Sequence, residues 1–218
     1  MNLSELREEL RSRVQDRSDI TDSILDRYIN NAYRTIATGK FVDITGQIRT
    51  LRFPEQELRT DTSLSTGTES YSVHPRMYAI INVSHEYDSS ASRWLNLKYL
   101  APGKFNELPE IEQRPYFYTF FHNNILVRPV PSSDWDGSTM RVWGYVLPVE
   151  LTTAAEEPNL KEHWHQLIAI LAASRLAGRF GFTELATDYE AEFKNVLSTM
   201  PTPYEMQAHI SATRNVVS

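Results

Sequence analysis

The stretch RPYFYTFFHNNILVRPVPSSDWDGSTMRVWGY, which runs from Arg114 to Tyr145, combines alternating apolar residues with the turn residues of consecutive β-strands. Five aromatic residues stand among its first eight positions, and in an extended strand they alternate between the two faces. Asn123 and Asn124 both tolerate positive φ, so they predict a tight hairpin turn. Asp and Gly in the DWDGS segment predict a second connection. We therefore expect a β structure whose aromatic strand lies in the core.

The β pattern extends from this stretch over about residues 41–150. Thr, Val, Tyr and Ile become frequent there, and Pro and Gly separate short apolar runs. A short helix is expected around LAPGKFNEL, where Ala101 or Pro102 begins its first turn. The expected strands are residues 48–53, 70–73, 78–87, 116–121, 125–129 and 140–147.

Both ends of the chain have helical periodicity instead. Residues 3–14 carry apolar side chains at helical spacing, and Asn2 and Glu5 stand where an N-cap and its reciprocal partner belong. Residues 22–37 form a second amphipathic pattern, which we expect to run antiparallel to the first helix. After the polar linker LTTAAEEPNL, two further helices are expected over residues 164–176 and 183–200.

Composition excludes several classes of function. The chain has 22 Lys plus Arg against 28 Asp plus Glu, and this net charge of −6 argues against a tight grip on phosphate backbones. Without cysteine there is no disulfide framework, thiolate metal site or cysteine nucleophile. Charged residues stand in MNLSELREEL where a signal peptide has an apolar run, and the most apolar stretch, residues 167–173, is shorter than a membrane span. We expect a soluble protein made inside the cell, without membrane contact.

These patterns predict an α+β fold. A helical bundle comes from the N- and C-terminal segments, and it is interrupted by an inserted, mostly antiparallel β domain and followed by an extended C-terminal tail. The expected division is residues 1–40 and 151–200 for the helical bundle, 41–150 for the β domain and 201–218 for the tail.

Four stretches in this order resemble the tailed-bacteriophage head-to-tail adaptor (connector) family. They are ITDSILDRYINNAYRTIA, LSTGTESYSVHPRMYAIINV, NNILVRPVPSSDWDGSTMRVWGYVLPVEL and LKEHWHQLIAILAASRLAGRFGFTELATDYEAEFKNVL. The similarity covers most of residues 20–200 and consists of patterns of helix, turn and strand. The HWH segment and the tail after Met200 depart from the family pattern.

The resemblance implies a structural virion protein of the neck, assembled in the host cytoplasm. It implies a helical bundle that docks under the portal protein, a β domain directed toward a downstream tail or nozzle protein, and a homo-oligomeric ring of twelve copies. DNA is then only a transient passenger in the lumen. Two alternatives from other classes are a tail-associated cell-wall hydrolase and a carbohydrate-binding module that uses Trp135 and the tyrosines.

No set of residues has the spacing of a catalytic or metal site. His163 and His165 are two residues apart on a helix and face different directions, unlike the i, i+4 pair that binds zinc. DWDGS lacks the further ligands of a calcium loop, whose twelfth position would be Tyr145. We therefore predict no catalytic residues, no cofactor and no metal. Nothing in the sequence brings together the carboxylates that a glycoside hydrolase would need, the candidates being Glu156, Glu157, Glu162, Glu190 and Glu192.

Two segments carry candidate partner-binding residues. Trp135 and Asp136 lie in the DWDGS turn, where we expect contact with a neighbouring protein. In PTPYEMQAHISATRNVVS, Tyr204, Met206 and Ile210 share one side of an alternating pattern that is typical of a half-buried strand. We predict that this tail adds as a strand to a sheet edge of the portal or of a neighbouring subunit. A disordered tail is the commoner fate of a terminus, and a helix is the weaker alternative.

Overall fold

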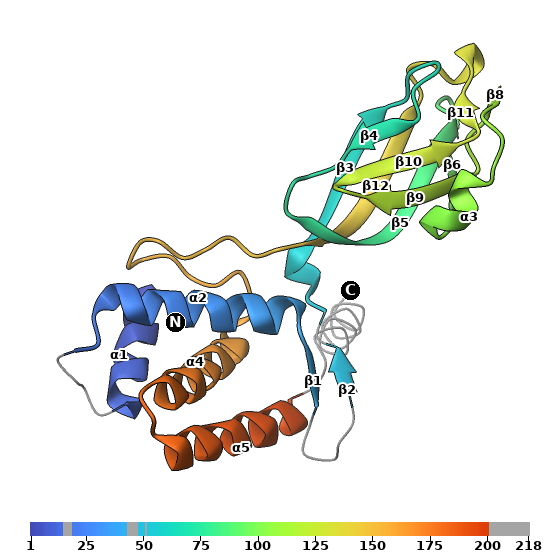
Figure 1. Ribbon diagram of the computed structural model, residues 1–218. Helices are drawn as coiled ribbons and strands as arrows, with labels where there is room; N and C mark the ends of the chain where they lie inside the picture. Colours follow the sequence, from blue (N-terminus) through green and yellow to red (C-terminus); the bar gives the residue numbers. More distant parts are fainter. Residues whose placement is uncertain (15–18, 43–47, 51, 201–218) are drawn as a thin grey trace, which may run out of the picture. The chain divides into compact units, whose positions relative to one another are not determined.

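The computed structural model describes residues 1–14, 19–42, 48–50 and 52–200. It divides into two compact units, each with its own core. The helical unit comprises residues 1–56 together with the chain from residue 147 onward, and the β unit comprises residues 57–146 (Figure 1). No helix in these described parts of the chain is long and apolar enough to cross a bilayer.

Helix α1 (Leu3–Arg13) begins at a capping box. The Asn2 side chain accepts a hydrogen bond from the Glu5 backbone N–H at 2.9 Å, and the Glu5 carboxylate accepts one from the Asn2 N–H at 2.9 Å. The sequence prediction of this N-cap is confirmed. The apolar stripe of the helix, fully buried in the helical unit, consists of Leu3, Leu6 and Leu10.

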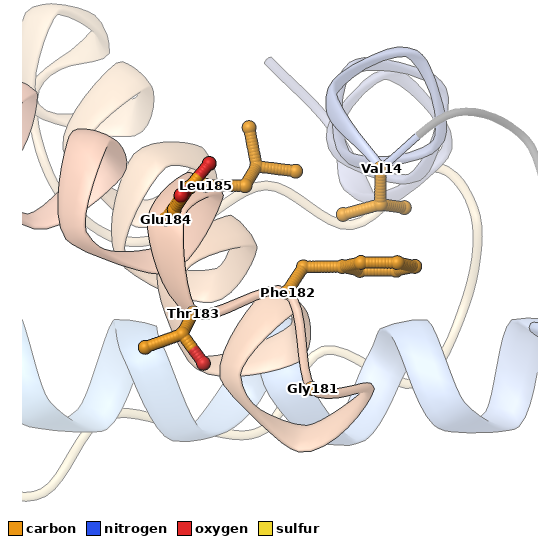
Figure 2. Close-up of a pocket in the computed structure, with 6 residues that line it drawn as sticks. All are labelled: Val14, Gly181, Phe182, Thr183, Glu184 and Leu185. Atoms are coloured by element: carbon orange, nitrogen blue, oxygen red, sulfur yellow. The ribbon is translucent and has the colours of Figure 1, made fainter.

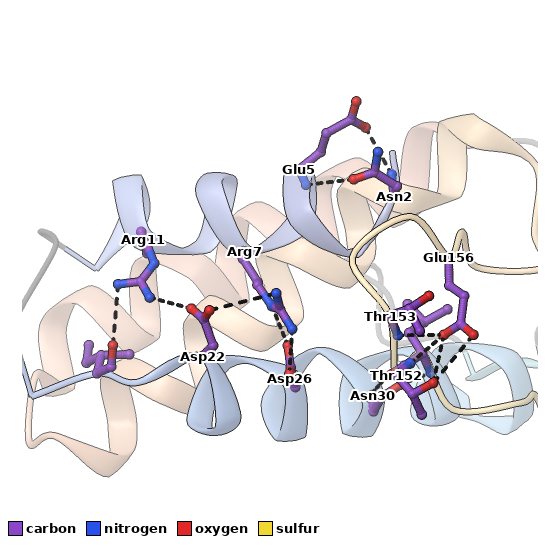
Figure 3. A network of polar contacts seen from close by, with 12 residues as sticks. Asn2, Glu5, Arg7, Arg11, Asp22, Asp26, Asn30, Thr152, Thr153 and Glu156 are labelled. Carbon is purple, nitrogen blue, oxygen red and sulfur yellow. Dashed lines mark hydrogen bonds and ion pairs between the residues drawn. The ribbon is translucent and has the colours of Figure 1, made fainter.

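Helix α2 (Asp22–Thr38) runs antiparallel to α1, as the order of their ion pairs shows (Figure 3). Arg7 pairs with Asp26 through two hydrogen bonds of 2.6 and 2.7 Å, and Arg11 pairs with Asp22 at 2.6 Å. The hydrogen bond from Arg11 lowers the pKa of the Asp22 carboxyl. Next to these acidic side chains, an apolar stripe of α2 enters the core through Leu25, Ile29, Ala32, Tyr33 and Ile36.

Helix α4 (His165–Arg179) is the centre of the helical unit and packs against α1, α2 and α5. It is apolar almost all round, as expected of a helix that is covered on several sides. The 3-10 turn η3 (Glu162–Trp164) precedes it, and the buried Trp164 ring lies edge-on to Phe53 at 5.0 Å. Each large aliphatic side chain buried on this helix contributes about 1.5–3 kcal/mol.

Helix α5 (Thr183–Thr199) covers one side of α4 and buries fewer residues, chiefly Phe193 and Leu197. Its Tyr189 hydroxyl donates to the Arg13 backbone carbonyl at 2.6 Å, which ties α5 to the end of α1. A two-stranded antiparallel ribbon, β1 (Lys40–Val42) and β2 (Ile48–Thr50), and the 3-10 turn η1 (Pro54–Gln56) complete the described part of this unit.

The β unit contains two four-stranded sheets that share one apolar core (Figure 1). The first is fully antiparallel, in the order β3 (Glu57–Ser63), β12 (Thr139–Val146), β5 (Met77–Asp88), β6 (Arg93–Asn96). The second has the order β4 (Ser70–Ser72), β10 (Asn124–Arg128), β9 (Phe117–Phe121), β7 (Lys98–Tyr99), and only β7 with β9 is parallel. Strands β8 (Glu112–Gln113) and β11 (Val130–Pro131) form a short parallel pair.

The opening stretch forms the expected hairpin, but its turn lies one residue earlier than predicted. His122 and Asn123 have φ of 47° and 61°, whereas Asn124 already pairs with Phe121 as the first residue of β10. Tyr118 of β9 is buried in the core, whereas Phe121 at the end of the strand is 53% exposed. The expected short helix is α3 (Pro102–Asn106), which begins after Ala101.

The predicted α+β fold, with mostly antiparallel sheets between helical ends, is confirmed. The predicted extended tail, residues 201–218, lies outside the described residues. The predicted four-segment division of the chain stays a prediction.

Candidate partner interface

The DWDGS turn is fastened to the neighbouring loop by main-chain and side-chain hydrogen bonds. It comprises the 3-10 turn η2 (Ser133–Trp135) and the residues that lead into β12. The Asp136 carboxylate accepts from the Thr66 backbone N–H at 2.9 Å, and the Gly137 N–H donates to the Leu64 carbonyl at 2.9 Å. Gly137 has φ of 75°, a conformation that glycine adopts without a steric penalty. Asp136 thus holds the turn in place although it is itself exposed.

Trp135 is half-buried and packs on the β unit's own side chains. Its ring meets the His85 ring edge-on, with centroids 5.0 Å apart. The Arg114 guanidinium also contacts this ring, and lies 5.2 Å from its centroid. The predicted contact residue is therefore also part of the internal packing of the turn, and its remaining surface is what a partner can reach.

His85 is a fully buried histidine beneath the turn. The Ser138 hydroxyl donates to the Trp135 carbonyl at 2.6 Å, so the His85 Nε2–H must donate to Ser138 Oγ, 3.0 Å away. The other ring nitrogen, Nδ1, has no hydrogen-bond partner among the described residues. Burial, and next the charge of Arg114, lowers the pKa of His85 to about 4. The ring is therefore neutral at physiological pH.

Arg114 is surrounded by three aromatic rings. Its guanidinium carbon is 4.7 Å from the centroid of Tyr87, 5.7 Å from that of Tyr116 and 5.2 Å from that of Trp135. Tyr87 is 38% exposed and Tyr116 is 46% exposed, so two of the rings reach the surface. Arg114 Nε is buried and finds no hydrogen-bond acceptor among the described residues. We call Arg114, Tyr87, Tyr116 and Trp135 the arginine–aromatic cluster.

A hollow of about 360 Å³ lies beside this turn and is strongly polar. Tyr87 and Trp135 contribute aromatic surface to it, and three carboxylates contribute negative charge. The described residues contain no group of three or more His, Asp or Glu that could hold a metal ion. The carboxylates of this hollow are Glu86, Asp134 and Asp136.

The helical unit has a second hollow, of about 460 Å³, where the end of α1 faces the turn between α4 and α5 (Figure 2). Its lining is polar and apolar in nearly equal parts, and Val14 and Phe182 face each other across it. Thr183 and Glu184 at the start of α5 add polar atoms. This hollow was not predicted from the sequence, because the exposure of Phe182 after Gly181 is known only from the fold.

The histidines and carboxylates considered for catalysis are separated or internally paired. The buried His165 has its Nε2 2.9 Å from the Leu160 carbonyl oxygen, and burial lowers its pKa and that of His163. Glu156 accepts hydrogen bonds from the Thr152 and Thr153 backbone N–H groups (Figure 3). Glu190 pairs with Lys194, and Glu192 with Arg13. The structure brings none of these groups together with a nucleophile and a general base in one described hollow.

Three of the five predicted contact residues, Tyr204, Met206 and Ile210, lie outside the described residues. The structure places Trp135 and Asp136 next to each other in the same turn, beside the arginine–aromatic cluster. Sequence reasoning missed Arg114, Tyr87 and His85, because they become neighbours only when β5 and the segment before β9 pack beneath the turn.

Comparison with known proteins identifies a family. A model of the family described as SU10 adaptor protein matches residues 1–217, and therefore spans both units. No curated protein matches the chain.

Proposed function

We infer the function of the chain from its family: it belongs to the SU10 adaptor proteins and is a structural adaptor protein of a bacteriophage. Copies of the chain form a closed homo-oligomeric ring of twelve in the virion neck. The ring joins the portal protein to a downstream tail or nozzle protein, after assembly in the host cytoplasm. DNA passes through its lumen during packaging and ejection.

The observation that carries this proposal is the extent of the family match. It spans residues 1–217, so the helical unit and the β unit are both parts of the adaptor. A protein that joins two different partners needs two contact surfaces, and two units with separate cores supply them. In a ring each copy also presents two unlike surfaces to its neighbours.

The proposed contact residues follow from this arrangement. Trp135 and Asp136 present the DWDGS turn of the β unit to a neighbouring protein. Tyr204, Met206 and Ile210 attach the tail to the portal or to the adjacent subunit as an added strand. Backbone hydrogen bonds then give affinity and alternate apolar side chains give register.

The net charge of −6 supports a passive lumen. DNA moves through a channel most freely when no continuous basic stripe holds its phosphates. We therefore expect duplex DNA to bind the isolated protein weakly. A filter-binding titration at low and moderate salt checks this, and tight binding with a steep salt dependence would contradict it.

Native mass spectrometry of the purified chain, followed by cryo-EM of the particle neck, tests the function. We expect a closed ring of twelve copies between portal and tail. The purified chain should not degrade peptidoglycan. His163→Ala, His165→Ala and Asp134→Ala should leave any peptidoglycan degradation by the whole particle unchanged. A chain that is monomeric in the neck, or turnover that one of these substitutions removes, would contradict the proposal.

A further inference from the structure

We propose that Arg114 binds a carboxylate of a second copy of this chain, at the contact between adjacent subunits. The inference rests on the proposed ring and assigns one of its contacts. The site is the arginine–aromatic cluster: the three rings hold the guanidinium in position, and the partner's carboxylate meets its N–H edge.

The hydrogen-bonding state of Arg114 points to an anion. A guanidinium is charged at every physiological pH and presents five N–H donors in one plane. Aromatic rings within about 6 Å stabilise the charge through its face, but they accept nothing from its edge. Arg114 Nε is buried, and no described residue accepts its hydrogen bond. A buried donor without an acceptor destabilises the chain, so the described residues leave this guanidinium incompletely paired. The Nη atoms are not among the buried unpaired atoms, and they are the part of the edge that a partner's carboxylate can reach.

Arg128 of the same unit shows what a satisfied arginine looks like. Its Nε donates to Glu69 at 2.7 Å and its Nη2 to Glu110 at 2.9 Å, while Nη1 donates to the Leu108 carbonyl at 2.7 Å. Arg128 also lies over the Phe105 ring, at 5.1 Å. Arg114 has the ring contacts of this arrangement and lacks its carboxylates.

The surroundings select a carboxylate rather than a phosphate. Glu86, Asp134 and Asp136 line the adjacent hollow, and they repel a doubly charged phosphate more strongly than a singly charged carboxylate. A planar carboxylate also matches the guanidinium fork with two parallel hydrogen bonds. The exposed Tyr87 and Tyr116 rings provide apolar surface for the stem of an Asp or Glu side chain and exclude water from the pair.

Charge complementarity favours a second copy of the chain as the source of the carboxylate. The chain has 28 acidic against 22 basic residues, so carboxylates are in excess. Glu107 and Glu184 are exposed, and no ion pair ties either of them to another described residue. A ring contact joins two unlike patches of one sequence, so an unpaired arginine on one patch is matched by an unpaired carboxylate on the other.

Photo-crosslinking in the assembled ring tests the contact. p-Benzoylphenylalanine replaces Tyr116, which keeps an aromatic ring beside Arg114, and irradiation of the ring is followed by mass spectrometry of the linked peptides. We expect links between two copies of this chain, in a segment that contains Asp or Glu. Links only to another protein, or none between copies of the ring, would overturn the inference.

Charge exchange then identifies the carboxylate. Arg114→Glu should lower the yield of rings at a fixed protein concentration by at least about tenfold, because it replaces an attractive charge pair at the contact with two like charges. Replacing the cross-linked carboxylate with Arg in the same chain should restore the yield. The matched control is Arg93→Glu, an exposed arginine at the start of β6, which should assemble as the wild type does.

The neutral variant Arg114→Gln is the control for a folding defect. It should give a folded monomer with the wild-type circular dichroism spectrum and the same loss of rings. Rings formed at wild-type yield by Arg114→Gln or Arg114→Glu would overturn the contact and leave the adaptor function standing. A wild-type chain that forms no ring would overturn both.

Discussion

Two arginines of the β unit, Arg128 and Arg141, differ in how strongly their removal should destabilise the fold. Arg128 is 6% exposed and donates to two carboxylates and two backbone carbonyls. Arg141 makes a two-bond pair with Asp61, at 2.8 Å each, on the sheet surface. Both pairs have good geometry. Because Arg128 is buried, its removal leaves polar groups without partners, whereas removal of Arg141 leaves groups that water can reach.

We predict that Arg128→Met lowers the free energy of unfolding of the β unit by about 3–5 kcal/mol, because it leaves the Glu69 carboxylate and buried carbonyls without a donor. Urea unfolding followed by tryptophan fluorescence measures this loss. The matched control Arg141→Met, which breaks a solvent-exposed pair, should cost about 1 kcal/mol or less. Similar losses in the two variants would contradict the assignment of Arg128 as the buried hub.

His85 predicts a specific pH dependence of stability. Its pKa in the folded chain is about 4, below the ordinary value of 6.5, so between these values the unfolded chain binds more protons than the folded chain. The contribution of His85 to the free energy of unfolding is therefore fully present above pH 6.5 and is lost as the pH decreases from 6.5 to 4, by about 3 kcal/mol. His85→Gln, whose amide can still donate to Ser138 Oγ, should remove this part of the slope. An unchanged slope in the variant would assign the acid loss to other groups.

Single residues of the candidate interface were predictable only where they are neighbours in sequence. Trp135 and Asp136 were identified because Asp and Gly mark a turn. Arg114 and His85 are separated from that turn by 20 residues or more along the sequence. Cation–π contacts have no fixed sequence spacing, so no pattern could bring Tyr87, Arg114 and Trp135 together before the fold was known.

Among secondary-structure elements, the predictions succeeded where one physical signal dominated. The 3.6-residue periodicity located α2 and α5 to within a residue or so, and buried apolar runs located β5 and β12. Strand β3 was missed, because the sequence ELRTDTS is polar and has almost no apolar alternation. Among the described strands it pairs with β12 alone and lies at the edge of its sheet, where charged residues are favoured over apolar ones.

The pairing of β12 with β5 depends on a glycine, which gives a prediction for the sheet. A Cβ on Gly144 would lie 2.5 Å from the Ala79 carbonyl oxygen and 2.8 Å from Met77 Sδ, at a shift in register between the two strands. We predict that Gly144→Ala destabilises the β unit by about 1–3 kcal/mol through overpacking.

Gly103 of α3 provides the control, because nothing lies within 4 Å of a Cβ added there. Gly103→Ala should be neutral or stabilising by up to about 1 kcal/mol, since Ala is the better helix residue. Thermal unfolding of both variants by circular dichroism compares them. A Gly144→Ala variant as stable as Gly103→Ala would show that the sheet relaxes at this bulge.

For the assembled particle, the sequence predicted the class of fold and the family but not the contacts. Interfaces are distinguished from other surfaces by small differences in composition, so no local pattern marks them. The arginine–aromatic cluster emerges only from the folded β unit, and its partner only from a second copy. Contacts made by residues 201–218 stay a prediction for the same reason: they depend on a surface of the portal or of a second copy of the chain.

The tail supplies the last prediction. Pro201 and Pro203 stop a helix and favour extended backbone, and the alternation that follows puts Tyr204, Met206 and Ile210 on one side. If this side is buried on a sheet edge of the portal or the adjacent subunit, deletion of residues 201–218 removes the attachment and keeps every core residue among those described, since these lie at or before Met200. The truncated chain should fold with the wild-type melting temperature and fail to join portal-containing heads. Heads purified from an infection with the truncated gene, and probed for the adaptor by quantitative mass spectrometry, measure its occupancy. The double variant Met206→Asp with Ile210→Asp should reproduce the loss, whereas Gln207→Asp with His209→Asp on the opposite side should retain attachment. Wild-type occupancy of the truncated chain would show that the anchor lies elsewhere in the adaptor.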